Sequence, residues 1–136
     1  MKFIDSNVFV YFADGRNPKK QAIARTVLAD AIGNRQYVIS SQVLNEFANV
    51  SLKKLGMTED EARKYVEEFQ HIRVVFQQDG LTVRALEIRK QYGLQFYDSL
   101  LLATAESVGC DIFLTEDLND GQTYCGIKVV NPFREA

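Results

Sequence analysis

The sequence is poor in the residues that bind soft metals or form cross-links. It has two Cys and one His among 136 residues. Cys110 and Cys125 are too few for the disulfide framework of a small secreted protein, and we expect both to be reduced. One His and two Cys also do not supply the four nitrogen or sulfur ligands of a usual zinc site. Any metal ion in this protein is therefore expected to be held by oxygen.

Long apolar segments are absent as well. No run approaches the roughly 20 residues that a membrane-spanning helix needs. The N-terminal "MKFIDSNVFVYF" is interrupted by Asp5 and Asn7, and no small-residue cleavage site follows it. We therefore expect a cytoplasmic protein without a signal peptide or membrane association. The length and the 46% apolar content indicate one globular domain over residues 1–136.

An excess of positive charge is the third absence. The chain has 16 basic and 18 acidic residues, a net charge of −2. This balance alone gives no support for nucleic-acid binding, which usually shows a basic excess.

Short apolar strands alternate with amphipathic helices along the chain. Strands are predicted at 2–5, 37–40, 72–76 and 112–115, with a candidate fifth at 127–131. Helices are predicted at 8–14, 17–33, 41–56, 58–70, 81–93 and 97–109. This alternation predicts an α/β fold, a three-layer α/β/α sandwich whose central, mainly parallel sheet has four to five strands.

Several helix ends carry recognisable signals. Asn17 with Pro18 predicts a cap followed by the first helical position. Thr58 with Glu61 predicts a capping box. Ser6 or Asn7 is the expected cap of the helix at 8–14.

Acidic residues gather at one edge of the predicted sheet. In open α/β sheets, ligands bind beyond the carboxyl ends of the strands. Asp5 lies at the end of the first strand, and Glu116 and Asp117 at the end of the fourth. Glu46 is six residues beyond the second strand, and Asp98 opens the helix that leads into the fourth.

Each acid also has an ordinary structural explanation. Asp98 could be an N-cap or a favourable charge at a helix start, and Asp5 could cap the helix after it. The acids of "DIFLTEDLNDG" suit a turn. Glu46 is harder to explain, because it lies beside the apolar stripe of its helix, where a Glu is seldom buried unless paired.

The set is more specific than its members. Two carboxylates ~4 Å apart repel by ~4 kcal/mol at an effective dielectric of ~20, so a cluster needs protons or cations. Mg²⁺ and Mn²⁺ match an all-oxygen ligand set. A calcium loop fits poorly, because the alternating ligands and final Glu of an EF-hand are missing after Glu116 or Asp117.

Four segments, in order, resemble the motifs of one nuclease family. They are "FIDSNVFV", "VLNEFANV", "FYDSLLLATA" and "FLTED", which span nearly the whole chain. Each is weak alone, but together they resemble the PIN-domain nucleases. The short length is most similar to the VapC-type toxins of bacterial and archaeal toxin–antitoxin pairs.

The resemblance implies roles for individual residues. Asp5, Glu46, Asp98 and Asp117 would be the catalytic acids that bind one or two Mg²⁺ or Mn²⁺ ions. Asn7 and Thr115 would support them through hydrogen bonds. Family members often carry a further Asp where this chain has Asn119. Glu116 and Asp120 are candidates to substitute for it, so binding of a second ion stays open.

The resemblance also implies an activity and partners. The expected reaction is endonucleolytic hydrolysis of RNA by metal-activated water, leaving a 5′ phosphate. Implied partners are an antitoxin protein and a second copy in a homodimer. Removing four metal-binding acids from the 18 leaves 14 against 16 basic residues, a balance of +2. Arg16, Lys19 and Lys20 are candidate RNA contacts, or equally solvated surface.

Two alternatives to a toxin stay open. One is a PIN nuclease with a housekeeping role in RNA processing, which only genomic context or growth arrest would separate from a toxin. The other is a receiver-like phosphoacceptor signalling domain. It fits less well, because the strands at 37–40 and 72–76 end without Asp. The single His, His71, offers no Ser–His–Asp arrangement.

Overall fold

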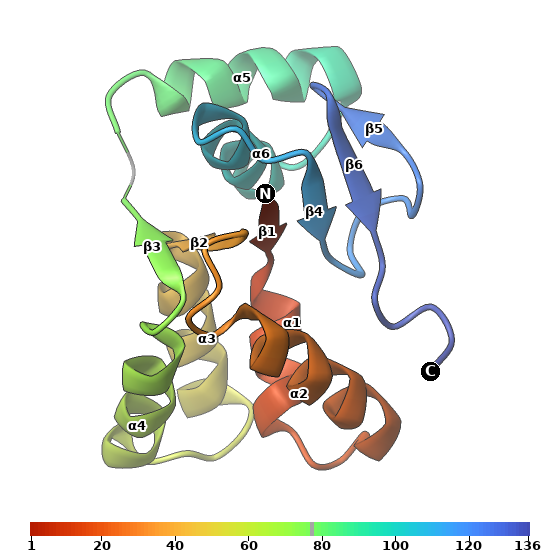
Figure 1. Cartoon of the computed structure of the whole chain (residues 1–136). Helices are drawn as coiled ribbons and strands as arrows, with labels where there is room; N and C mark the ends of the chain where they lie inside the picture. The colour runs from red at the N-terminus through yellow and green to blue at the C-terminus, as the bar shows by residue number, and fades with distance from the viewer. Residues whose placement is uncertain (77) are drawn as a thin grey trace.

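Six strands form one sheet in the computed structural model, which describes residues 1–76 and 78–136. The strand order is β3-β2-β1-β4-β6-β5 (Figure 1). All neighbouring pairs are parallel except β5 with β6. The strands are β1 (Lys2–Ile4), β2 (Tyr37–Ser40), β3 (Arg73–Val75), β4 (Ile112–Leu114), β5 (Thr123–Tyr124) and β6 (Ile127–Val130).

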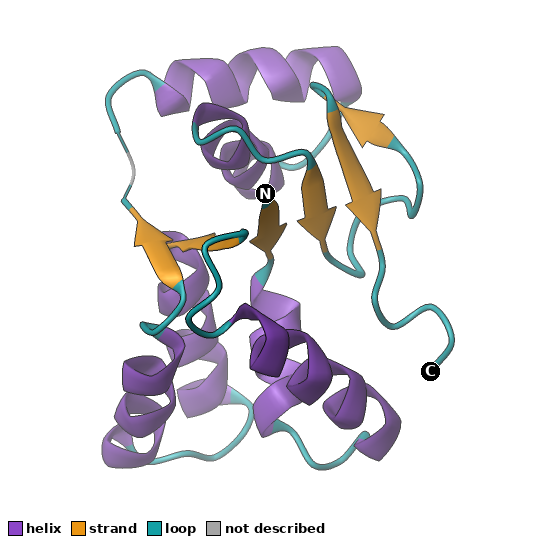
Figure 2. Cartoon of the chain, in the orientation of Figure 1, coloured by secondary structure: helices purple, strands orange, loops and turns teal. Residues whose placement is uncertain are grey.

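Helices lie on both sides of this sheet. They are α1 (Ser6–Ala13), α2 (Pro18–Ala31), α3 (Ser41–Lys53), α4 (Glu59–Phe69), α5 (Leu81–Tyr92) and α6 (Phe96–Ser107). Helices α5 and α6 pack together on one side, and α1 to α4 lie on the other (Figures 1 and 2). The predicted three-layer α/β/α arrangement is confirmed. Within the described ranges, no helix is both long and apolar enough to cross a membrane.

The sheet has one strand more than the sequence predicted. Strand β5 has only two residues and pairs antiparallel with β6 through the two-residue turn Cys125–Gly126. Both turn residues have positive φ, +48° and +78°, as a type I′ hairpin requires. The strand was missed because two residues show no alternation, and Cys-Gly is not one of the dipeptides that signal such a turn.

Two helix starts differ from the prediction. The N-cap of α1 is Asp5, whose side chain accepts from the backbone N–H of Ser6. The capping role considered for Asp5 is therefore confirmed, and the alternative caps Ser6 and Asn7 are wrong. The N-cap of α6 is Gln95, and Asp98 lies inside the first turn. There its charge favours the helix dipole. The caps at Asn17 and Thr58 are confirmed, the latter as a full capping box with Glu61.

The core between α1, α3 and α4 centres on Phe69. Its ring is fully buried and lies edge-on to Phe9 and Phe47, with centroids 4.7 and 4.9 Å away. Phe12 makes a third edge contact at 5.6 Å. These aromatic pairs fix α4 against the helices that begin at the carboxyl ends of β1 and β2.

Phe69→Ala is expected to lower the free energy of unfolding by about 3–5 kcal/mol, because the ring leaves a cavity among three others. Urea denaturation followed by circular dichroism measures the change. Phe76→Ala is the matched control. The Phe76 ring is 71% exposed, so its loss should stay within about 0.5 kcal/mol. Equal effects of the two substitutions would contradict a core centred on Phe69.

Candidate functional site

The site is built where β1 and β4 end side by side. Ile4 pairs with Leu114, so Asp5 and Thr115 emerge together at the carboxyl edge of the sheet. The Asp5 backbone N–H donates to the Leu114 carbonyl at 3.0 Å. The Thr115 hydroxyl donates to Asp5 Oδ2 at 2.9 Å. Parallel strand pairing therefore sets the position of the first acid.

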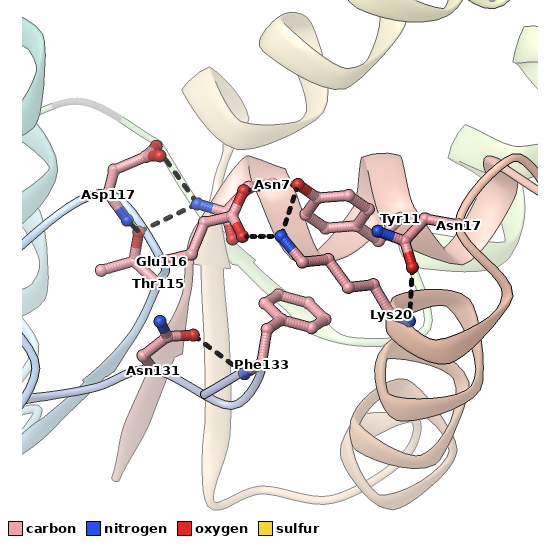
Figure 3. Close-up of polar contacts among 9 residues, drawn as sticks. All are labelled: Asn7, Tyr11, Asn17, Lys20, Thr115, Glu116, Asp117, Asn131 and Phe133. Atoms are coloured by element: carbon pink, nitrogen blue, oxygen red, sulfur yellow. Dashed lines mark hydrogen bonds and ion pairs between the residues drawn. The ribbon is translucent and has the colours of Figure 1, made fainter. Parts of the chain in front are cut away.

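Asn7 joins Asp5 to the last acid. Its Nδ2 donates to Thr115 Oγ1 at 2.9 Å, to Asp117 Oδ2 at 3.2 Å and to Asp5 Oδ2 at 3.4 Å. Figure 3 shows the first two of these contacts. The Asp117 backbone N–H donates to Thr115 Oγ1 at 3.0 Å. The oxygen of the same amide, Asn7 Oδ1, is buried and has no hydrogen-bond partner among the described residues.

Ser6 and Gln42 hold the second acid, Glu46. The Ser6 hydroxyl donates to Glu46 Oε2 at 2.8 Å, and Gln42 Nε2 donates to Oε1 at 2.6 Å. The Ser6 backbone N–H also donates to Asp5 Oδ1 at 2.6 Å, so one residue links two acids. Neither Ser6 nor Gln42 was among the predicted site residues. The i, i+4 spacing of Gln42 and Glu46 was an available signal.

Electrostatics couple all four acids. Asp5 is 3% exposed. Burial raises the pKa of the Asp5 carboxyl to about 7, although the hydrogen bonds from Thr115 and Ser6 lower it. The negative charges of Glu46 and Asp117 also contribute to the increase. Burial also raises the pKa of half-buried Asp98, with added contributions from Asp117 and Glu46. The charges of Glu46 and Asp117 therefore raise the pKa of both Asp5 and Asp98.

The donor set fits a hard divalent cation in chemistry. The four carboxylates offer only oxygen donors, which Mg²⁺ and Mn²⁺ prefer. With the side chains as they stand, no three acidic, His or Cys residues in the described ranges approach closely enough to hold one ion. Hydrogen bonds from Ser6, Gln42 and Asn7 separate the like charges instead.

Glu116 is engaged away from this cluster. It accepts from the Tyr11 hydroxyl at 2.6 Å and from Lys20 Nζ at 2.9 Å. The Lys20 ammonium lies 4.7 Å from the centroid of the Tyr11 ring and 5.9 Å from that of Phe133 (Figure 3). Consecutive residues thus point to different partners, Glu116 to Lys20 and Asp117 to Asn7.

The next two candidates are engaged in the turn that follows. Asp120 accepts from the backbone N–H of Asn131 at 2.8 Å and from Arg134 at 3.1 Å. Asn119 donates to Gln122 at 2.9 Å. These contacts tie the loop after β4 to the segment after β6.

The three candidate RNA contacts differ in environment. Lys20 is committed to Glu116 and Tyr11. Arg16 is exposed and makes a two-point ion pair with Asp14 at 2.9 Å. Lys19 is exposed. Only Arg16 and Lys19 present their charge mainly to solvent.

The fold and the acid cluster define an α/β protein with a carboxylate site at the end of a parallel sheet. The model of the family described as "PIN domain" matches residues 2–119. The chain belongs to the PIN-domain family. A search of curated protein sequences gives no significant match.

Solved structures with a similar fold include three proteins of toxin–antitoxin systems. A toxin–antitoxin complex from Klebsiella pneumoniae has a TM-score of 0.70 at 17% identity, covering 97% of this chain and 98% of that one. VapC20 of Mycobacterium tuberculosis, a sarcin–ricin loop cleaving toxin, has 0.69 at 14%, covering 93% and 98%. VapBC2 of Rickettsia felis, bound to a promoter DNA fragment, has 0.67 at 18%, covering 94% and 96%.

The raised pKa of Asp5 predicts a stability that falls with pH. Because the folded pKa of about 7 lies above the ordinary 3.8, the folded state binds more protons between these values. The free energy of unfolding of metal-free protein should therefore drop by roughly 2–3 kcal/mol from pH 5 to pH 7 through this group. Urea titrations in EDTA at pH 5, 6, 7 and 8 measure it.

Asp5→Asn should flatten this pH dependence, since the variant has no carboxyl to titrate. Asp60→Asn is the control, because the Asp60 side chain is 85% exposed and should leave the slope unchanged. An unaltered slope in Asp5→Asn would show that the buried carboxyl does not determine it.

Proposed function

We propose that this protein is an endoribonuclease that depends on Mg²⁺ or Mn²⁺ and acts as the toxin of a type II toxin–antitoxin pair. The main supporting observation is that acids from separate segments meet at one end of the sheet. Ser6, Asn7 and Thr115 join Asp5, Glu46 and Asp117 in one hydrogen-bond network. Asp98 lies near enough for the charges of Asp117 and Glu46 to raise its pKa. Membership of the PIN-domain family supports the reaction class.

Asp5, Glu46, Asp98 and Asp117 would hold one or two cations. A cation bound there lowers the pKa of water and offsets negative charge on the phosphate and on the leaving oxygen. Such a role explains why the fold keeps mutually repelling carboxylates together, since they act on a cation and not on one another.

The neutral residues of the site orient the acids. Asn7 and Thr115 hold Asp5 and Asp117 in fixed relation through short hydrogen bonds. Ser6 does the same for Asp5 and Glu46. Positioning of this kind reduces the reorganisation needed when substrate and cation arrive.

Glu116 is assigned a structural role and not a ligand role. Its carboxylate is neutralised within the protein by Lys20 and hydrogen-bonded by Tyr11. The ion pair thus removes one negative charge from the approach to the site and fixes the segment that carries Asp117. The Asp120 carboxylate likewise accepts hydrogen bonds from Arg134 and from the backbone N–H of Asn131.

The toxin role and its partners rest on the similar folds of toxin–antitoxin proteins. An antitoxin or a second copy needs apolar surface. Large apolar residues that are exposed in the described ranges are Leu52, Phe76, Val83, Leu86 and Tyr97. Two adjoining hollows of about 390 and 360 Å³ share Val66 of α4 and Gln70, the residue that follows this helix. Phe76 borders the first and Leu52 the second. An amphipathic helix of the antitoxin suits this groove.

The purified protein should cut single-stranded RNA in Mg²⁺ or Mn²⁺ and not in EDTA. Asp98→Asn should lower the rate by at least about a hundredfold, because the cluster loses a charged ligand. Gel assays on a labelled RNA, together with circular dichroism of the variant, test this expectation.

Asp60→Asn is the matched control and should keep the wild-type rate, since this exposed acid belongs to α4. A second readout is the thermal midpoint, which Mn²⁺ should raise in the wild type and raise less in Asp98→Asn. A folded Asp98→Asn variant with full activity would overturn the site assignment.

Induced expression of the chain in bacteria should arrest growth, and coexpression of the small open reading frame beside its gene should relieve the arrest. Total RNA from arrested cells should contain new 5′-phosphate ends. Asp98→Asn should be harmless in the same assay. RNA cutting in vitro without growth arrest would favour a housekeeping nuclease over a toxin.

A further inference from the structure

A hollow of about 470 Å³ lies directly beside the acid cluster. One wall is helix α3, which contributes Gln42, Asn45, Glu46 and Asn49. The other is the start of α6, with Gln95, Tyr97 and Asp98. Two of the four acids thus line this hollow, and the remaining lining residues are four amides and one aromatic ring.

Helical spacing sets the amide wall. Gln42, Asn45 and Asn49 follow one another at i, i+3 and i+7, so they share one face of α3 with Glu46. The Gln42 amide donates a hydrogen bond to Glu46. The amides of Asn45 and Asn49 have no hydrogen-bond partner within the described part of the chain, and both residues are exposed. Gln95 on the opposite wall is also exposed and makes no side-chain capping bond to α6.

Tyr97 separates this hollow from a smaller one. Tyr97 is 66% exposed, although the α6 residues 99–105 are buried. The smaller hollow, about 170 Å³, shares Gln42, Asn45 and Tyr97 with the first. It is also lined by Ser40, whose hydroxyl is buried and has no partner among the described residues. Unsatisfied buried hydroxyls are rare, and this one belongs to a residue that lines the smaller hollow.

The chemistry of the lining selects the kind of ligand. No Lys or Arg borders either hollow, and two carboxylates do, so a phosphate group is disfavoured. Free amides offer both donors and acceptors, and the tyrosine offers a flat apolar face. A planar, uncharged group with donors and acceptors on its edge matches all of these features, and a nucleobase is such a group.

We propose that the larger hollow, between α3 and the start of α6, binds one unpaired nucleobase of the RNA next to the phosphate that is cut. The base stacks on Tyr97, and Asn45, Asn49 and Gln95 hydrogen-bond its edge. This inference rests on the proposed ribonuclease function and adds the part of the substrate that the protein reads. It follows that the substrate is single-stranded at this position, because paired bases do not expose these edges.

Cleavage kinetics and cut-site sequencing on a random single-stranded RNA pool test the site. The wild type should prefer one or two bases at a fixed position beside the cut. Tyr97→Ala should raise KM about tenfold or more with a smaller effect on kcat, as expected for one lost base–aromatic stack. Tyr97→Phe should restore KM, because the ring is retained. Asn45→Ala and Asn49→Ala should weaken the base preference.

His71→Ala is the matched control, since this ring is similarly exposed, at 65%, and borders neither hollow. It should leave KM and preference unchanged. Wild-type KM and preference in Tyr97→Ala, Asn45→Ala and Asn49→Ala would overturn the base site. So would a Tyr97→Phe variant as impaired as Tyr97→Ala.

Binding without cutting separates this inference from the proposed function. Fluorescence anisotropy of a labelled single-stranded RNA is measured in Mg²⁺ with Asp117→Asn, with and without Tyr97→Ala. Tyr97-dependent binding in this assay, together with a wild-type protein that does not cut RNA, would reject the nuclease and retain the base site. RNA cutting by the wild type with binding that does not depend on Tyr97 would retain the nuclease and reject the base site. The absence of both binding and cutting would reject both proposals. Loss of antitoxin relief in Tyr97→Ala with unchanged RNA kinetics would assign the hollow to a protein partner and overturn the proposal.

Discussion

The carboxylate of Asp5 is the constraint on which the rest of the site depends. It is buried at the end of a central strand, where charge is unfavourable, and its pKa is raised accordingly. Donors converge on it from Thr115, which follows the neighbouring strand β4, and from Ser6 and Asn7 on the helix that it caps. The same three residues contact Glu46 or Asp117. The residues that hold the buried Asp5 carboxylate thus also position Glu46 and Asp117.

The fold was largely predictable because the repeat of strand and helix is a local property of the sequence. Apolar runs and capping residues such as Asn17 and Thr58 indicate where most elements begin. The prediction was wrong where a short-range signal was missing. Strand β5 is created by pairing with β6 across a Cys-Gly turn, and tertiary pairing has no local signature in two residues. The sequence left Asp5, Ser6 and Asn7 open as caps of α1, and the structure selects Asp5, which serves the strand end and the helix start at once.

The site was predictable only to the level of topology. Parallel strands bring their carboxyl ends to one edge, so acids placed there can be grouped without knowing any contact. Side-chain partners are another matter. Glu116 and Asp117 are neighbours in the chain, and their different roles depend on Lys20, which is 96 residues from Glu116. Ser6 was read only as a helix cap, although its hydroxyl reaches a residue 40 positions away. Long-range pairing of this kind is decided by packing.

The net charge of −2 poses a question that the arrangement of side chains answers. A negatively charged protein gains little from long-range attraction to RNA. Here the acids are concentrated at one position, where cations would neutralise them, and Lys20 neutralises Glu116 beside it. The adjoining hollow is lined by amides and a ring. One base–aromatic stack contributes about 1–3 kcal/mol by a mechanism that salt screens little. In the proposed ribonuclease, affinity would come from contacts to the bases and the bound cations would offset the charge of the phosphate, so the negative net charge would not prevent RNA binding.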